Sequence, residues 1–325
     1  MYQEPPKVEY DKDIERLIKY YQQAYKEILS SVVDLANIPD SEDVYQRQAA
    51  LLQQVGSILA QLNTENKIWC EQMIKQAYTN GQAAALLSTG MAVSLLAATN
   101  MVQFSQLSQQ TVDALINDTY NDLLAATSNT ERRIKQIVRQ TVGNVLRQRT
   151  AKNFGRKTIS KDIASQLTKK GLSEKVNKDG FVGIVDKAGR RWDVKRYAEM
   201  VTRTKLNQAH VEGVRTSGIE RGIDLAVIST HNAEDECNHY EGMIISLNGI
   251  TEGLLSYDEI RNTNRCFHPN CQHKVHLVKP SLLPKAVKDK HASKVAALPY
   301  RGLKMKIKPL EDIKMIDKEE VRKIV

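Results

Sequence analysis

Hydrophobic residues recur at three- and four-residue steps through much of the first 150 residues. Of all features of the sequence, this spacing limits the possible folds most strongly. Residues at these steps share one face of an α-helix, which can then be buried. The predicted helices start at Asp13 and, after a break at 37–43, cover 41–63, 64–79, 111–126 and 132–152. Aromatic residues make up only 6% of the chain, which suits long helices better than a β-rich core.

Two polar signals help to place the ends of these helices. Ser41 is the expected N-cap of the second helix. Ser128 and Glu131 have the spacing of a capping box, which predicts that the basic helix over 132–152 begins there as a separate element.

Residues 76–112 contain no charged side chain. The run "AAALLSTGMAVSLLAA" within them is the candidate for a membrane span. Ser88, Gly90 and Ser94 interrupt it, and it falls short of the roughly 20 apolar residues that a span needs. We therefore expect no membrane span, and we expect the small residues to permit close approach of helices, within one chain or between copies.

The hydrophobic pattern changes after residue 175. A β-hairpin is predicted over 181–192, followed by a long helix that Asp193 caps and Gly222 ends. Short apolar runs predict three strands, at 223–230, 243–247 and 274–278. The fold class is therefore α+β: a long-helix N-terminal unit, a small α+β C-terminal domain and a basic tail.

Three regions follow from these patterns. We expect a helical assembly domain at 1–155, an α+β domain at 156–278 that includes a short helix over 161–170, and a basic tail at 279–325. Within the tail, 303–310 alternates like an edge strand, and 311–325 has the pattern of a short helix. Part of the tail is expected to order only with a partner.

The net charge of +9 is unevenly distributed. Residues 1–130 carry −7, 131–221 carry +14, 222–278 carry −5 and 279–325 carry +7. A basic block of this size predicts non-specific binding to double-stranded DNA through its phosphates. The candidate contacts are Arg132, Arg133, Lys135, Arg139, Arg147 and Arg149. The alternative is a helix with a core-facing apolar side and a solvated, charged back.

Cysteine and histidine are concentrated between residues 224 and 278, which hold three of the four cysteines and five of the seven histidines. Two turns there can supply four tetrahedral nitrogen and sulfur ligands, as in a structural zinc site. The predicted ligands are His231, Cys237, Cys271 and His273, with zinc as the candidate cofactor. Two alternatives stay open: a disulfide such as Cys237–Cys271, or buried cysteines beside polar surface histidines.

Other features limit the remaining function classes. Four cysteines, with Cys70 isolated, and a polar N-terminus without a signal peptide predict assembly in a reducing cytoplasm. No Gly-rich phosphate loop, nucleophile elbow or HExxH motif is present. We expect no enzyme. The alternative is a metal-dependent nuclease acting through His268 and Asn270, and a transferase-like domain is a weaker one.

Four segments carry a resemblance to a known family: "RYAEMVTRTKLNQAHVEG", "GIDLAVISTHNAEDEC", "YEGMIISL" and "HPNCQHKV". They resemble the phage minor capsid protein 2 family, which is similar to the Mu F-like head morphogenesis proteins. The resemblance covers residues 10–278, is most specific from Trp192 to Val278, and leaves out the tail after Pro280. In the family, Gln commonly stands at the position of Glu241, and the loop before the last cysteine is longer and Gly-rich.

The resemblance implies a structural, non-catalytic protein of a tailed-phage head from a Gram-positive host. Its implied partners are the portal protein, capsid or scaffold proteins and the packaged DNA, and the helical region 1–155 would dock on the portal. The implied location is the virion, inside the head near the portal, and the host cytoplasm during assembly. The matched polar positions are Arg203, Thr204, Asn207, Gln208, His231, Cys237, Glu241, Gly242, Asn270, Cys271 and His273. The first four are expected to be structural.

Overall fold

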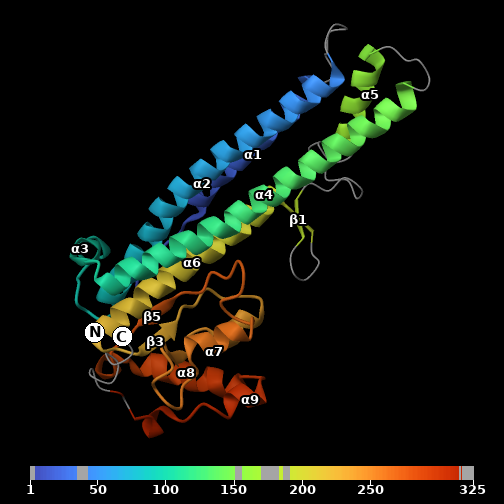
Figure 1. Cartoon of the computed structure of the whole chain (residues 1–325). Coiled ribbons are helices and arrows are strands. Elements are labelled where there is room, and N and C mark those ends of the chain that lie inside the picture. Colours follow the sequence, from blue (N-terminus) through green and yellow to red (C-terminus); the bar gives the residue numbers. More distant parts are fainter. Residues whose placement is uncertain are drawn as a thin grey trace. The chain divides into compact units, whose positions relative to one another are not determined.

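The structure is a computed structural model that describes residues 4–34, 43–150, 156–169, 183–185, 191–314 and 316 (Figure 1). Its helices are α1 (Asp11–Asp34), α2 (Val44–Ser88), α3 (Leu95–Met101), α4 (Gln106–Thr150), α5 (Arg156–Lys169), α6 (Val194–Arg221), α7 (Tyr257–Asn262), α8 (Lys285–Ala297) and α9 (Arg301–Lys304). Its strands are β1 (Gly183–Val185), β2 (Arg191–Asp193), β3 (Leu225–Ile228), β4 (Ile244–Ser246) and β5 (Val275–Leu277). The long helices and the small sheet confirm the predicted α+β class.

The chain forms two compact units, and both are built from separated segments. The first unit contains residues 1–10, 71–117 and 203–325, and the second contains 11–70 and 118–202. The helices α2, α4 and α6 each contribute residues to both units. The predicted domains, with boundaries at residues 155 and 278, are continuous in sequence, unlike these two units. The predicted boundaries stay a prediction.

The second unit is held by apolar helix faces with a few buried polar anchors. The helix α1 buries the side that carries Ile14, Leu17 and Ile28, as its spacing predicted. Trp69 donates its indole N–H to the carbonyl oxygen of Asp13 at 3.0 Å. Such bonds satisfy polar atoms that burial would otherwise leave without partners.

Two helices are longer than their sequence patterns indicated. The predicted end near residue 63 and the predicted start after the capping box at Ser128 are both wrong, because α2 and α4 run straight through these positions. Neither stretch contains proline, and Ala, Gln and Leu favour continuation of a helix. The Thr127 hydroxyl donates to backbone carbonyl oxygens in the preceding turn of α4, and the Thr130 hydroxyl does the same. Both residues therefore fit inside the continuous helix. The candidate N-cap Ser41 lies outside the described residues.

Two glycines allow α2 and α6 to come into backbone contact within the first unit. A Cβ atom on Gly81 would collide with the carbonyl oxygen of His210, and one on Gly213 would collide with that of Tyr78. Only glycine permits such an approach. The expectation that small residues in the uncharged stretch permit close helix packing is confirmed at Gly81.

The three-stranded sheet of the first unit has the order β4-β3-β5, and both pairs are antiparallel. The chain enters β3 through Gly222, whose φ of 68° ends α6, while the Ile223 N–H donates to the Gly218 carbonyl oxygen at 2.8 Å. At the other end of α6, Asp193 accepts from the Arg196 N–H at 2.9 Å. The predicted cap, helix end and three strands are confirmed, and so is the pairing of β1 with β2.

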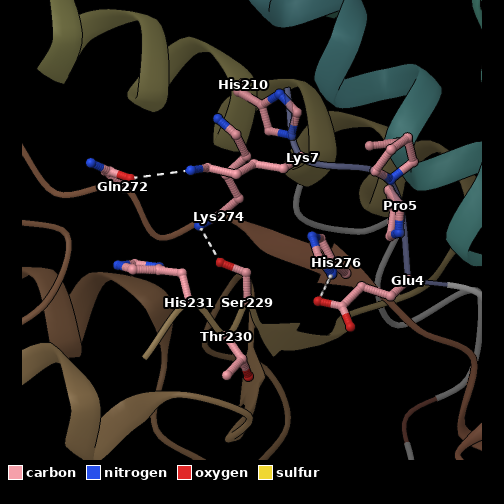
Figure 2. A pocket seen from close by; sticks show the side chains of 12 residues that line it. Glu4, Pro5, Lys7, His210, Ser229, Thr230, His231, Gln272, Lys274 and His276 are labelled. Atoms are coloured by element: carbon pink, nitrogen blue, oxygen red, sulfur yellow. Dashed lines mark hydrogen bonds and ion pairs between the residues drawn. The ribbon is translucent and has the colours of Figure 1, made fainter. Parts of the chain in front are cut away.

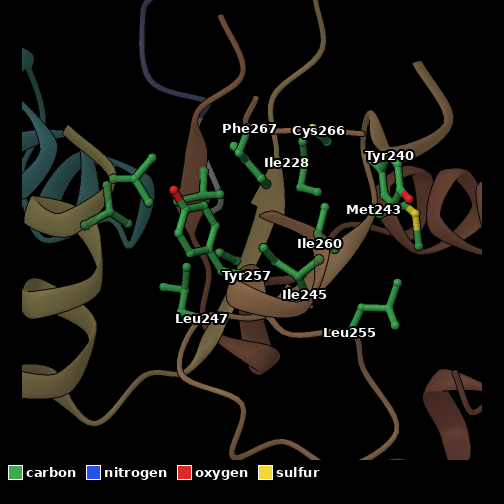
Figure 3. Packing of buried hydrophobic residues seen from close by; sticks show 14 of the residues in the cluster. Ile228, Tyr240, Met243, Ile245, Leu247, Leu255, Tyr257, Ile260, Cys266 and Phe267 are labelled. Atoms are coloured by element: carbon green, nitrogen blue, oxygen red, sulfur yellow. The ribbon is translucent and has the colours of Figure 1, made fainter. Parts of the chain in front are cut away.

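Both faces of β3 are buried, because alternate residues enter two apolar clusters. Ala226 and Ile228 join the larger cluster, and Leu225 and Val227 join the smaller one. In Figure 3 the larger cluster includes Tyr257 and Phe267, whose ring centroids are 4.7 Å apart. The sheet is thereby a rigid base for the loops that leave β3 and enter β5.

The chain after residue 279 is more ordered than the predicted tail. It forms α8 and α9, and the edge strand expected at 303–310 is wrong. Tyr300, Leu303 and Ile307 pack on the larger cluster, although only Leu303 lies within α9. Most of the helix expected over 311–325 lies outside the described residues. Within the described part of the chain, no helix has the length and apolar character of a membrane span.

Candidate metal centre

Four side chains of the first unit form a buried cluster of metal-ligand type: Cys237, Cys266, Cys271 and His273. Cys237 lies on a 3₁₀ helix, η2 (Glu236–Tyr240), while the other three lie in the loop between α7 and β5. Their ligand atoms all fall within 4.8 Å of one another, and each residue is at most 5% exposed. Two loops that are separate in sequence therefore deliver three sulfur atoms and one nitrogen to the same point.

The separations between these atoms match a tetrahedral site. Zinc–sulfur and zinc–nitrogen bonds of about 2.3 and 2.0 Å imply edges of about 3.7 Å between sulfurs and about 3.5 Å from sulfur to nitrogen. The Cys237 and Cys271 sulfurs are 3.7 Å apart, and the Cys271 sulfur lies 3.3 Å from His273 Nδ1. Cys237 and Cys271 form no disulfide in the structure. The cluster could hold one metal ion with little rearrangement.

The backbone around the cluster adopts left-handed conformations at four residues other than glycine. These are Asn232, Asn264, Phe267 and Asn270, with φ between 56° and 65°. Asparagine tolerates this region, but a bulky side chain such as that of Phe267 rarely occupies it. Phe267 follows Cys266 directly, so the turn that orients this sulfur is held in a strained form by the packing of the ring.

The sulfurs cannot all ionise without a counter-charge. Hydrogen bonds from the Cys237 and Cys266 thiols lower the pKa of Cys271. Bonds with Cys237 and Cys271 raise the pKa of Cys266, which favours its neutral form. Ionisation of one sulfur therefore opposes ionisation of its neighbours, whereas a divalent ion would stabilise all three as thiolates.

Glu241 fixes the orientation of His273. Its Oε1 atom accepts from the backbone N–H groups of His231 and Ala233, both at 3.0 Å, and lies 3.1 Å from His273 Nε2. Burial opposes ionisation of this carboxyl, but the three bonds outweigh it and lower the pKa of Glu241. A carboxylate at this position favours a proton on Nε2 of His273, which would leave the Nδ1 lone pair for a metal ion.

Two further histidines flank the cluster. The rings of His231 and His273 have centroids 4.0 Å apart, and His231 Nδ1 lies 3.9 Å from Glu241 Oε1. On the other side, His268 Nε2 lies 3.1 Å from the Cys237 sulfur and 3.2 Å from Asp235 Oδ2. His231 is therefore placed to support His273, and His268 is placed to support Cys237.

The helix α6 holds the loop that carries Cys271. Asn207 donates from its side-chain amide to the carbonyl oxygens of Cys271 and His273, at 3.2 and 2.8 Å. The Thr204 hydroxyl accepts from the Asn270 N–H at 3.1 Å. Asn207 and Thr204 thus hold the candidate metal ligands through backbone groups. Arg203 and Gln208 are half-buried on the same helix.

The structure brings together three of the four predicted ligands, Cys237, Cys271 and His273. It places His231 beside His273 and outside the group of four, and it places Cys266 inside that group. Sequence reasoning passed over Cys266 because it looked for two pairs of ligands from two turns. The available signal was its position five residues before Cys271, within reach of one loop.

The predicted DNA contacts lie on the second half of α4. Arg132, Arg133, Arg139 and Arg147 are exposed, while Lys135 is half-buried and pairs with Glu131 at 2.5 Å. Arg147 also donates to Asn144 Oδ1 at 2.6 Å. The side chain of Arg149 lies outside the described residues. The opposite side of this helix buries Ile134, Val138, Val142 and Val145, as the sequence pattern predicted.

Comparison with known families defines the class of this protein, a minor capsid protein of a phage. The profile of phage minor capsid protein 2 matches residues 8–300. The chain therefore belongs to the phage minor capsid protein 2 family, and the match extends past residue 278, where the resemblance was expected to end. No curated protein and no solved structure matches the chain. Family membership makes the protein a component of the virion that contacts other head proteins.

Proposed function

We propose that the protein is a non-catalytic minor capsid component that joins the head with the portal protein and stays inside the head beside the packaged DNA. The observation that carries the structural role is the closed set of three cysteines and one histidine. Structural zinc sites have four protein ligands, whereas catalytic sites keep one position for water or substrate. The family membership supports the assignment to the head.

Zinc is the metal that best fits this set of ligands. Thiolate and imidazole ligands in a tetrahedral arrangement favour zinc over the harder ions magnesium and calcium. The bound ion would tie η2 to the loop before β5. Because the unfolded chain lacks the site, its binding free energy would add to the stability of the first unit.

The exposed arginines of α4 supply the proposed contact with DNA. Arg132, Arg133 and Arg139 have no role in the apolar core, and their surroundings between 131 and 221 carry 23 basic against 9 acidic residues. Phosphate neutralisation requires only such charges and no reading of base edges. The contact would therefore be independent of DNA sequence.

The experiment that tests the location is cross-linking mass spectrometry on purified phage particles. We expect the protein in intact virions, with cross-links from residues 1–155 to the portal and from the α4 face to DNA. Cross-links only to the outer surface of the major capsid protein would contradict the proposal. Incubation with supercoiled plasmid and Mg²⁺ or Mn²⁺ tests the nuclease alternative: intact plasmid agrees with the structural role, and nicking contradicts it.

A further inference from the structure

A second polar site lies in the first unit, in a cavity of about 100 Å³ bounded by five segments of the chain. Lys7 comes from the N-terminal segment and His210 from α6. Thr230 follows β3, Lys274 directly precedes β5, and His276 lies in β5. In Figure 2, His210 and Lys7 lie on one side of this space, and Ser229 and Thr230 lie on the other. The space is sufficient for several water molecules or one oxyanion.

Lys274 is the strongest sign of a missing partner. Its side chain is only 9% exposed, and it has no carboxylate partner among the described residues. Its amine has Asn207 Oδ1 at 3.5 Å and the ring centroid of Tyr10 at 5.0 Å. A buried ammonium group is costly unless it is paired, so these two neutral contacts compensate it poorly.

Other groups around the cavity also have unused hydrogen-bonding capacity. His210 is 1% exposed, and its Nε2 atom has no hydrogen-bond partner within the described part of the chain. Thr230 Oγ1 accepts from Lys290 Nζ at 2.8 Å, and Ser229 Oγ accepts from the Lys274 N–H at 2.9 Å. Each of these hydroxyl groups therefore keeps its own proton for a further acceptor.

One carboxylate, that of Glu4, lines the cavity. Its Oε1 atom lies 3.8 Å from His276 Nδ1, and its side chain is 59% exposed. The described lining thus has two lysines against one acidic side chain. Lys7 also has exposed contacts with Glu9 Oε1 at 3.5 Å and with Gln272 Oε1 at 3.4 Å, whereas Lys274 is buried. Glu4 approaches from the edge and would compete with any other anion for this site.

We propose that this cavity binds a phosphate-class oxyanion, either free phosphate or the terminal phosphate of a nucleic-acid strand, with Lys7 and Lys274 as the charged donors. Two ammonium groups at one cavity favour a doubly charged oxyanion over a singly charged carboxylate. The proposal requires neither a bound metal nor the contact between α4 and DNA, although Asn207 contacts both Lys274 and the loop that carries Cys271.

Isothermal titration calorimetry of the full chain with sodium phosphate, at constant ionic strength maintained with chloride, tests the site. We expect saturable binding of one phosphate per chain. Lys274→Met and Lys7→Gln should each weaken it by about tenfold or more, since a charge-assisted bond is lost. Lys285→Gln, which removes an exposed charge on α8 away from the cavity, should change the affinity less than twofold. No saturable heat with the wild-type chain, or equal weakening by Lys285→Gln, would overturn the proposal.

Glu4→Gln gives a test that loss of folding cannot imitate, because it should strengthen phosphate binding. Glu4 is exposed and belongs to neither the metal centre nor the core. An unchanged or weaker affinity would contradict the competition. A second titration compares 5′-phosphorylated with 5′-hydroxyl oligonucleotides: a preference for the phosphorylated strand that Lys274→Met abolishes assigns a nucleic-acid end, and no preference, with phosphate still binding, assigns the free anion.

Discussion

The Cys/His cluster and the arginine face of α4 are the two chemically distinctive regions of this chain, and they differ in how they are built. The cluster is buried, and neighbours hold its candidate ligands in place, as Glu241 holds His273 and Asn207 holds the backbone of Cys271. The arginines are exposed, and their nearest bonds are local contacts such as that of Arg147 with Asn144. The first region depends on exact folded geometry, and the second depends on charge density along a helix.

This difference predicts opposite responses to substitution. Removal of one atom from the cluster should destabilise the first unit, whereas removal of several charges from α4 should change binding and leave stability nearly intact. The four predictions that follow test this contrast, in order of decreasing expected effect.

Loss of a cluster sulfur should have the largest effect. Cys271→Ser should abolish stoichiometric zinc binding and lower the free energy of unfolding by at least about 3 kcal/mol, because metal binding and folding are coupled. Denaturant unfolding followed by circular dichroism measures this. Cys70→Ser is the matched control, since Cys70 is fully buried in the second unit and far from the cluster in sequence. Its own destabilisation should not depend on zinc; if it does, the cluster is not the source of the effect.

Acid should destabilise the first unit through buried neutral histidines. His291 is 3% exposed and accepts from the Ile244 N–H at 3.0 Å, and burial lowers its pKa to about 4 from 6.5. The pKa of His291 is lower in the folded state than in the unfolded state, so protonation favours the unfolded state. The stability of the neutral histidine is therefore complete above pH 6.5 and is lost as the pH falls towards 4, by up to about 3 kcal/mol.

The variant His291→Asn keeps an acceptor for the Ile244 N–H but does not titrate. Between pH 4.5 and 6, the slope of its unfolding free energy against pH should be smaller than that of the wild type by about one proton, roughly 1.4 kcal/mol per pH unit. Identical slopes for the two proteins would show that His291 is already solvated in the folded state.

Glu241 tests whether the groups that orient the cluster affect zinc affinity, because it would influence the ion only through His273. Glu241→Ala should weaken zinc binding by about 10- to 100-fold, the usual cost of losing the group that orients a ligand. Glu241→Gln retains an acceptor oxygen and should recover most of the affinity. Competition with a chromophoric chelator measures both constants. Equal affinity for Glu241→Ala and the wild type would exclude the orienting role.

Neutralising the α4 face should have the smallest effect on stability. The triple variant Arg132→Gln, Arg133→Gln and Arg139→Gln should change the unfolding free energy by no more than about 0.5 kcal/mol per site. Its affinity for DNA should fall, and the slope of log affinity against log salt should decrease by up to about 3. Fluorescence anisotropy with two unrelated duplexes tests this. A preference for one sequence, or an unchanged salt slope, would contradict a phosphate contact.

Local signals in the sequence predicted the parts of the fold that local physics determines. The Asp193 cap, the Gly222 helix end and the three short strands all follow from residues within a few positions of one another. The Ser128 signal misled because a capping box is only a preference, and helix packing overrode it. The alternation at 303–310 misled because its apolar residues pack on a core formed by distant segments.

The candidate metal centre could be predicted only in part, for a similar reason. Clustering of cysteine and histidine predicted that these side chains meet, but not which four face one another. The choice of Cys266 in place of His231 depends on the left-handed turn at Phe267 and on the bond between Glu241 and His273. Both are consequences of the packed first unit, and neither leaves a pattern in the spacing of the sequence.

The zinc content of the purified chain, measured by inductively coupled plasma mass spectrometry before and after dialysis against a chelator, tests the central claim most directly. We predict one zinc per chain, loss of the metal in chelator, and a fall in the unfolding temperature that added zinc reverses. Less than about one-tenth of a zinc per chain after expression and dialysis in zinc-containing medium, with the same unfolding temperature in chelator, would contradict the claim.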